Sequence, residues 1–209
     1  MPKQVIIFDF DGTIADSLES FIKVTNDFAD KFGFEKFTKE SIENFRDNTL
    51  WENVKRIKIS KLKSYRLLGK ILDNLGKTIP NTKPFPGIKA SLKELKKNGH
   101  TLGILTTNRV QNVEQFLKKH ELEFFDFIHS CSLFGKSKVI NKIMDELKIE
   151  AKDVIYVGDE VRDIEAARKA KIPIIAVGWG YNSKKLLQKY NPDYLIDKPR
   201  ELVEVLNEI

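Results

Sequence analysis

The spacing of hydrophobic residues changes twice along the chain. Residues 5–10 form a short, apolar, β-branched run, which is typical of a buried strand in a parallel sheet. Over residues 17–77 apolar residues recur at helical spacing, and no strand-like run interrupts them. Pro80, Pro84, Pro86 and Gly87 then indicate a linker and a helix start.

Beyond this linker, strand-like and helix-like segments alternate to the end of the chain. The predicted elements are strands at 101–106, 127–130, 154–157, 173–177 and 194–196, and helices at 88–97, 110–119, 137–147, 161–170 and 201–206. Such alternation predicts βαβ units, and therefore an α/β fold with a Rossmann-like parallel sheet and helices on both faces. The earlier helical segment is then an insertion. We expect a catalytic core at 1–16 and 85–209 and a small α-helical cap domain at 17–84.

Composition excludes several classes of protein. The 209 residues are 41% hydrophobic and 32% charged, which is ordinary for a globular chain. Cys131 is the only cysteine, so no internal disulfide can form. No apolar run approaches the roughly 20 residues that cross a bilayer. We expect a cytoplasmic monomer or homodimer with no membrane association and no signal peptide.

The net charge of +6 is concentrated in the predicted cap. Residues 17–84 hold 14 basic and 9 acidic side chains, and residues 55–70 hold seven basic and no acidic ones. This run is interpreted first as the solvated face of amphipathic helices. A field that attracts anionic substrates is the second interpretation. Nucleic acid is the least favoured partner, because no recognised nucleic-acid-binding module accompanies the charge.

Two carboxylates follow the first predicted strand. Ligands of open α/β sheets bind beyond the carboxyl ends of the strands, so these positions are the first candidates for a site. Strand alternation puts Asp9 and Asp11 on one side of the chain. Such close carboxylates repel each other and require a cation or a shared proton. The alternative is an ordinary Asp-Gly turn at Asp11 and Gly12.

Hydrogen-bond donors follow the next two strands. Thr106, Thr107 and Asn108 could hold a phosphate oxygen, or could equally cap the helix that follows. Lys136 lies at a predicted helix start, where a cation is unfavourable unless an anion is close. The alternative is a surface lysine beside a capping serine.

A further pair of carboxylates follows the strand at 154–157. Asp159 ends that strand, and Asp163 lies four residues later on the same helical face. Acidic residues in a first helical turn are also favourable without any function. Together with the other strand-end residues, however, they predict a site for a hard divalent cation and a phosphate. Mg²⁺ is the expected ion, because it binds carboxylates, waters and substrate phosphates.

Other candidate sites are weak. Residues 178–180, Gly-Trp-Gly, lack the third glycine of a dinucleotide-binding loop and are interpreted as a loop after a late strand. The three histidines are dispersed, which gives no support for a zinc site or a catalytic triad. Cys131 is interpreted as a packing residue.

The strand-end motifs resemble those of a known family. Residues 9–13 (Asp-Phe-Asp-Gly-Thr), Thr106, Lys136 and residues 158–163 (Gly-Asp-Glu-Val-Arg-Asp) are similar, in order and spacing, to the four motifs of the haloacid dehalogenase superfamily. A helical cap inserted after the first motif is similar to its phosphoglycolate phosphatase-type branch. The resemblance covers essentially the whole chain, although in the cap it is one of layout only.

This resemblance implies roles for the motif residues. Asp9 would be the nucleophile that forms an aspartyl-phosphate, and Asp11 the general acid and then the general base. The metal would be held by the Asp9 side chain, the Asp11 backbone carbonyl and Asp159, with Asp163 supporting it. Thr106 would donate to a phosphate oxygen, and Lys136 would neutralise charge on Asp9 and the phosphate. Thr107 and Asn108 would contact the substrate.

Two of these assignments have competitors. Thr107 competes with Thr106, and Lys138 competes with Lys136; in each case we prefer the residue nearer the strand end.

The predicted function is Mg²⁺-dependent hydrolysis of a small phosphate monoester. Family members that act as dehalogenases lack an aspartate two residues after the nucleophile, so Asp11 favours a phosphatase or phosphomutase. A sugar phosphomutase is the alternative within the family, and a phosphonate-cleaving enzyme with a cap lysine also stays open. From another class, the alternative is a non-catalytic binding module that uses its basic cap.

Overall fold

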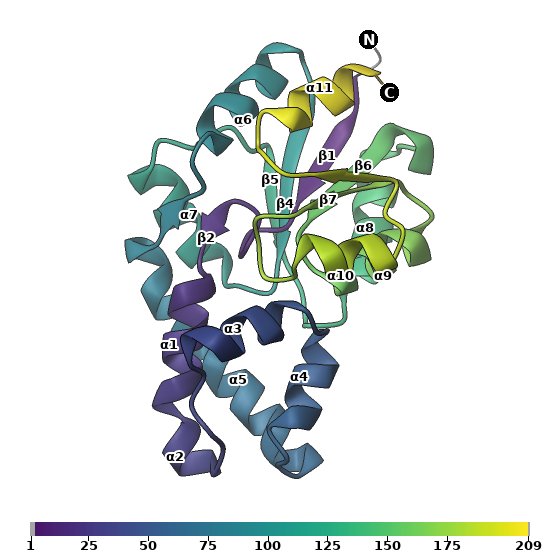
Figure 1. Ribbon diagram of the computed structural model, residues 1–209. Helices are drawn as coiled ribbons and strands as arrows, with labels where there is room; N and C mark the ends of the chain where they lie inside the picture. The colour runs from purple at the N-terminus through teal and green to yellow at the C-terminus, as the bar shows by residue number, and fades with distance from the viewer. Residues whose placement is uncertain (1–2, 209) are drawn as a thin grey trace.

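The computed structural model describes residues 3–208, and its centre is a six-stranded sheet in the order β5-β4-β1-β6-β7-β8 (Figure 1). The strands are β1 (Val5–Phe8), β4 (Thr101–Thr106), β5 (Phe127–Ser130), β6 (Val154–Gly158), β7 (Ile174–Val177) and β8 (Tyr194–Ile196). All five neighbouring pairs are parallel. The predicted α/β fold with a Rossmann-like parallel sheet is confirmed, and β1, which carries the first motif, lies inside the sheet.

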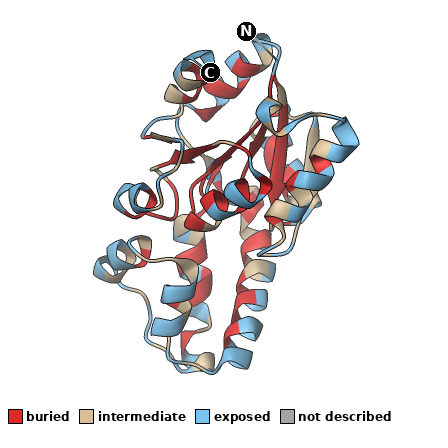
Figure 2. Cartoon of the chain, turned by 90° about the vertical axis from the view of Figure 1, so that its right-hand side faces the viewer, coloured by how far each residue is buried: buried red, intermediate tan, exposed pale blue. Residues whose placement is uncertain are grey.

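Helices cover both faces of this sheet because alternate strand residues point in opposite directions. Ile6 and Phe8 belong to the core beneath α6 (Ile88–Lys97), α7 (Val110–Lys119) and α11 (Glu201–Glu208). Val5 and Ile7 belong to the core beneath α8 (Lys136–Leu147), α9 (Val161–Ala170) and α10 (Lys184–Lys189). The central strands are buried along their length (Figure 2). The two-sided burial explains why these strands are continuously apolar in sequence.

A helical insertion separates β1 from β4, as expected. Its helices are α1 (Leu18–Asp27), α2 (Ala29–Phe32), α3 (Lys39–Arg46), α4 (Leu50–Arg56) and α5 (Lys61–Thr78), followed by a 3-10 turn at Ile79–Asn81. They enclose a separate core that includes Phe21, Phe45 and Ile71. Two short antiparallel strands, β2 (Ala15–Asp16) and β3 (Lys83–Pro84), join the insertion to the sheet domain. The cap-domain limits of 17 and 84 remain a prediction.

Side-chain caps explain where three helices of the insertion begin. Thr38, Thr49 and Ser60 each accept a hydrogen bond from the backbone N–H three residues later, at the starts of α3, α4 and α5. Such a cap satisfies a backbone donor that the helix itself leaves free. The starts of these helices are therefore encoded locally.

The structure differs from the prediction in two elements near the site. The first strand ends at Phe8 and not at residue 10, because the chain turns there and the Phe10 carbonyl accepts bonds from the N–H groups of Ile14 and Ala15 at 2.9 and 3.0 Å. Helix α10 was not predicted. Its local signal is Ser183, which caps it by accepting from the N–H of Leu186 at 3.2 Å.

Within residues 3–208, no helix has both the length and the apolar character that a bilayer crossing requires.

Candidate active site

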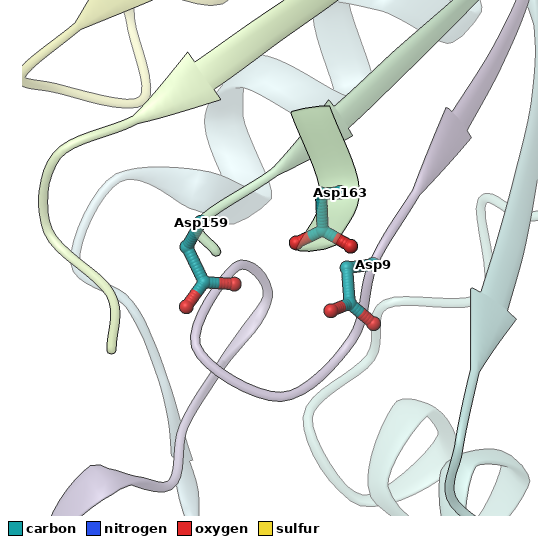
Figure 3. A group of neighbouring side chains, drawn as sticks. All are labelled: Asp9, Asp159 and Asp163. Atoms are coloured by element: carbon teal, nitrogen blue, oxygen red, sulfur yellow. The ribbon is translucent and has the colours of Figure 1, made fainter. Parts of the chain in front are cut away.

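Three buried carboxylates converge at the carboxyl edge of the sheet. Asp9 follows β1, Asp159 follows β6, and Asp163 lies in the first turn of α9 (Figure 3). One carboxylate oxygen from each lies within 4.8 Å of the others. Asp9 is 2% exposed, and Asp159 and Asp163 have no exposed surface. Residues separated by about 150 positions are therefore brought to one point by the parallel strands.

Lys136 connects two of these carboxylates. Its Nζ lies 2.6 Å from Oδ2 of Asp9 and 2.5 Å from Oδ1 of Asp163, and the side chain is buried. Burial alone would lower the pKa of Lys136, but Asp163 and Asp9 raise it well above its ordinary value. The side chain is therefore a charged ammonium. Lys138, the alternative, is exposed on the same helix.

Asp159 is held by the loops around it rather than by a cation. Its Oδ1 accepts from the hydroxyl of Thr13 at 2.7 Å, and its Oδ2 accepts from the backbone N–H of Tyr181 at 2.7 Å. A Cβ at Gly12 would lie 2.1 Å from Oδ2 of Asp159, and one at Gly180 would lie 2.3 Å from its Cβ. Only glycine permits this close approach.

Asp11 lies on the other side of the first-motif turn, toward the helical insertion. Its Oδ2 accepts from Nδ2 of Asn108 at 3.3 Å, and its Oδ1 is buried without a hydrogen-bond partner among the described residues. Burial raises the pKa of Asp11 above its ordinary value. A carboxyl group in this setting holds a proton more readily than one in water.

The residues after β4 are brought to the same edge. Thr106 is fully buried, and its hydroxyl accepts from the backbone N–H of Asn108 at 3.0 Å. Thr107 is half-buried and lines the cavity that also contains Asp11. Asn108 contacts Asp11 directly. Both threonines thus lie close to the site: Thr106 is fully buried, and Thr107 lines the cavity.

The site has an excess of negative charge that fits a metal ion. Lys136 is the single cation within residues 3–208 that forms an ion pair with Asp9, Asp11, Asp159 or Asp163. Burial raises the pKa of Asp9 to about 7. Burial, followed by the neighbouring carboxylate of Glu160, raises the pKa of Asp159 well above its ordinary value. Buried carboxylates need a positive partner to remain charged, and a hard dication with oxygen ligands would supply it.

Both carboxylate oxygens of Asp163 are also engaged. Its Oδ1 accepts from Lys136, and its Oδ2 accepts from the backbone N–H of Glu160 at 3.0 Å. The latter bond belongs to the capping box that begins α9. Asp163 therefore orients Lys136 and the helix start. That Asp163 also supports the metal remains a prediction.

The helical insertion is hydrogen-bonded to the loop after β7. The backbone N–H of Ser183 donates to the carbonyl of Arg46 at 2.8 Å, and Nδ2 of Asn182 donates to the carbonyl of Asn48 at 3.1 Å. This loop is the same one that contacts Asp159 through Tyr181. The insertion is thus joined to the loop that contacts Asp159.

Sequence reasoning missed the function of this loop. The Gly-Trp-Gly of residues 178–180 is no dinucleotide site: Gly180 and Tyr181 pack directly against Asp159. Arg162, inside the fourth motif, was also given no role, although its guanidinium is nearly buried. Two signals were available in the sequence: the glycine at position 180, and a basic residue, Arg162, in an otherwise acidic motif.

Comparison with known proteins agrees with this geometry. The family model described as haloacid dehalogenase-like hydrolase matches residues 6–177. The chain belongs to the haloacid dehalogenase-like hydrolase family. The resemblance stated from the motifs is confirmed, as is the expectation of an enzyme of this hydrolase class.

Relatives and solved structures cover the whole chain. A protein of Synechococcus elongatus named phosphoglycolate phosphatase is 32% identical over 208 residues, which is 99% of this chain and 98% of that protein. Pyrophosphatase PpaX of Bacillus mycoides is 26% identical, over 100% of this chain and 99% of the relative. The structure of a predicted phosphatase from Clostridium acetobutylicum has a TM-score of 0.82 and 25% identity, with complete coverage of both chains. These names agree with the phosphatase class predicted from Asp11.

Proposed function

We propose that the protein is a Mg²⁺-dependent phosphatase that hydrolyses a small-molecule phosphate monoester through an aspartyl-phosphate on Asp9. The observation that carries this proposal is the group of three buried carboxylates of Asp9, Asp159 and Asp163, with Lys136 bonded to two of them. Phosphoryl transfer needs positioned groups and compensation of charge more than it needs elaborate covalent chemistry.

Asp9 and Asp11 divide the chemistry between them. An oxygen of Asp9 attacks phosphorus, the ester P–O bond breaks, and its electron pair goes to the leaving oxygen, which takes a proton from Asp11. Water then attacks the phosphorus of the aspartyl-phosphate and gives a proton to Asp11, while the bond from phosphorus to Asp9 breaks. The ion pair with Lys136 favours the charged form of Asp9, and burial without a cation partner favours protonated Asp11.

The chain offers oxygen ligands for the metal. The carboxylates of Asp9 and Asp159 and the backbone carbonyl of Asp11 would hold Mg²⁺, with Asp163 in support. When bound, Mg²⁺ supplies positive charge to the phosphate oxygens and to Asp9. Thr106 and Lys136 would donate to the phosphate oxygens, and Thr107 and Asn108 would contact the rest of the substrate.

The names of two relatives support a particular class of substrate. One is named for phosphoglycolate and another for pyrophosphate, and both names describe small phosphate compounds with a second anionic group. We propose a substrate of this kind, with the helical insertion excluding water during the first step. The enzyme would act in the cytoplasm.

Replacement of Asp9 tests the proposal. Asp9→Asn should lower turnover of an aryl phosphate by on the order of a thousand-fold or more, because the amide is a poor nucleophile. Asp145→Asn, a change at an exposed position of α8, is the matched control and should leave turnover unchanged. EDTA should abolish turnover, and added Mg²⁺ should restore it. Full turnover by Asp9→Asn would refute the proposal.

The same experiment separates a phosphatase from a sugar phosphomutase. A phosphatase releases inorganic phosphate in step with product, whereas a mutase returns the phosphoryl group to a sugar phosphate. Phosphate release equal to the ester consumed would support the phosphatase.

A further inference from the structure

A small, partly open cavity lies between Asp11 and the helical insertion. Its volume is about 40 Å³, enough for about three water molecules. The insertion contributes mainly apolar side chains to its wall, among them Phe21, Leu50, Leu68 and Leu72. The sheet domain contributes polar residues, which include Asp11, Thr107, Glu160 and Arg162.

The cavity lies where the leaving group of the substrate would be. In the proposed function, Asp11 protonates the oxygen that departs from phosphorus. Asp11 lines the cavity, whereas Asp9 and Lys136 are not among the described residues that line it. The space therefore lies beside Asp11. Its small volume suits a leaving group of only a few atoms.

Arg162 is the single cation in the described wall of this cavity. Its Nη2 donates to Oε1 of Glu160 at 2.6 Å, and its Nη1 donates to the carbonyl of Leu133 at 3.5 Å. Its Nε is buried and has no hydrogen-bond partner among residues 3–208. Glu160 thus holds the guanidinium in place, while Nη1 makes only a long contact.

The basic run of the insertion does not serve this cavity. All seven basic residues of 55–70 are exposed, and none of them is among the described residues of the cavity wall. An anion in the cavity would therefore meet Arg162 rather than the charge that dominates the composition of the insertion. Arg guanidinium groups bind carboxylate and phosphate oxygens through two parallel hydrogen bonds.

We propose that Arg162 is a specificity-determining residue that binds an anionic group, a carboxylate or a second phosphate, on the leaving group of the substrate. This inference rests on the proposed function and assigns its selectivity to one side chain. A largely buried charge that is already oriented binds an opposite charge with little rearrangement, whereas a neutral leaving group of the same size gains no such ion pair.

The test compares matched esters on the wild-type enzyme and on Arg162→Gln. The esters are phosphoglycolate, whose leaving group carries a carboxylate, and 2-hydroxyethyl phosphate, which has a hydroxyl in its place; pyrophosphate is the arm for a second phosphate. The wild-type enzyme should prefer at least one anionic substrate over 2-hydroxyethyl phosphate by about tenfold or more in kcat/KM. Arg162→Gln should lower kcat/KM for that anionic substrate by about 30- to 100-fold, and for 2-hydroxyethyl phosphate by less than about threefold.

Two further variants complete the design. Arg66→Gln removes an exposed arginine of α5 and should not change the preference. Arg162→Lys keeps the positive charge but loses the planar guanidinium, so it should retain part of the preference for the anionic substrate. It replaces Arg162→Gln in the test if that variant does not fold.

The possible failures are distinct. If the wild-type enzyme turns over neither an aryl phosphate nor any of these substrates, the proposed function is overturned and the role of Arg162 with it. If it turns over the aryl phosphate but none of these substrates, only the role of Arg162 is overturned. If it hydrolyses all of them without preference, or if Arg162→Gln slows all of them equally, only the role of Arg162 is overturned. A preference that depends on Arg66 would likewise overturn it, in favour of the surface of the insertion.

Discussion

The sheet domain and the helical insertion use charge in opposite ways. At the edge of the sheet, Asp9, Asp159 and Asp163 are buried, and Lys136 pairs with two of them, Asp9 and Asp163. In the insertion, the seven basic residues of 55–70 are exposed, and buried and exposed positions alternate along the helices (Figure 2). On α5, Leu67 and Leu68 are buried, whereas Leu62 is exposed. The insertion holds most of the net charge, yet it presents a mainly apolar wall to the site.

This difference shows that the amount of charge in a segment says little about its chemistry. Exposed charges are screened by water and salt, so each one acts weakly on a distant ligand. Buried charges act strongly because the surrounding medium is less polar. A few buried charges in the sheet domain therefore act on a ligand more strongly than the many exposed charges of the insertion.

The largest effect is expected at Lys136. Lys136→Met removes the ammonium that Asp9 and Asp163 share, so kcat/KM for a phosphate ester should fall by on the order of a thousand-fold. The free energy of unfolding should fall by about 3–5 kcal/mol if Asp9 and Asp163 remain charged. Steady-state kinetics and chemical denaturation measure the two. Lys138→Met, at an exposed site on the same helix, should change neither kcat/KM nor the free energy of unfolding. A loss of less than about tenfold in kcat/KM for Lys136→Met would contradict the charge compensation by Lys136.

A smaller effect is expected from one methyl group at Gly12. Gly12 has φ +79°, and its added Cβ would clash with the carboxylate of Asp159. Gly12→Ala should therefore lower kcat/KM by about 10- to 100-fold, raise the Mg²⁺ concentration for half-maximal activity, and destabilise the fold by about 1–3 kcal/mol.

Gly69 in α5 is the matched control for this change. A Cβ there meets nothing within 4 Å. Gly69→Ala should leave activity unchanged and stabilise the helix by up to about 1 kcal/mol. Equal losses in the two glycine variants would contradict the close approach at Asp159.

The effect of pH on stability should depend on the metal. The pKa of Asp9 is raised by burial from 3.8 to about 7, so between these values the metal-free native state holds a proton that the unfolded chain lacks. The contribution of Asp9 to the stability of the metal-free protein is therefore full below about pH 4 and is lost as the pH rises through 7. Mg²⁺ needs the deprotonated carboxylate, so its stabilisation should grow over the same range. Thermal melts at pH 5 and pH 8 should show a Tm gain from Mg²⁺ that is several degrees larger at pH 8.

Asp9→Asn provides the control for the pH experiment. It removes one of the titrating ligands, so the Tm gain from Mg²⁺ should be smaller, and its increase between pH 5 and pH 8 should be reduced. A gain in the unaltered protein that does not change with pH would contradict the link between Asp9 and the metal.

The smallest effect is expected from the exposed charges of the insertion. A triple variant with Lys55→Gln, Lys58→Gln and Lys63→Gln should change kcat/KM for phosphoglycolate by less than about threefold at physiological ionic strength, because these side chains are exposed. A tenfold loss would restore the interpretation that the insertion attracts anionic substrates through its field.

Local patterns were sufficient for most of the fold. The alternation after residue 87 predicted the five later strands of the sheet, because each holds a short run of apolar residues between helix-like segments. Helix α10 was missed because its apolar residues are too few to show a period, although Ser183 caps it. The strand ending at Phe8 was extended to residue 10 because Phe10 is apolar, whereas its carbonyl in fact closes a turn.

Strand ends were equally informative about the site. Asp9, Asp11, Asp159 and Asp163 were all singled out from their places after apolar runs, and the structure brings Asp9, Asp159 and Asp163 together. The loop at Gly180 and Tyr181 could not be assigned, since its contact with Asp159 involves a backbone N–H and a missing Cβ, neither of which leaves a pattern in sequence.

Sequence by itself determined the sheet, the insertion and the set of carboxylates, because each depends on the order of apolar and polar residues along a short stretch of chain. Only the tertiary structure decided which charges are buried. Lys136 and Lys138 are two residues apart and chemically identical, yet one is bonded to two carboxylates and the other is exposed. The same holds for Arg162 against the seven basic residues of 55–70. Burial depends on which segments pack over a side chain, and it is burial that makes a charge strong enough to select a substrate.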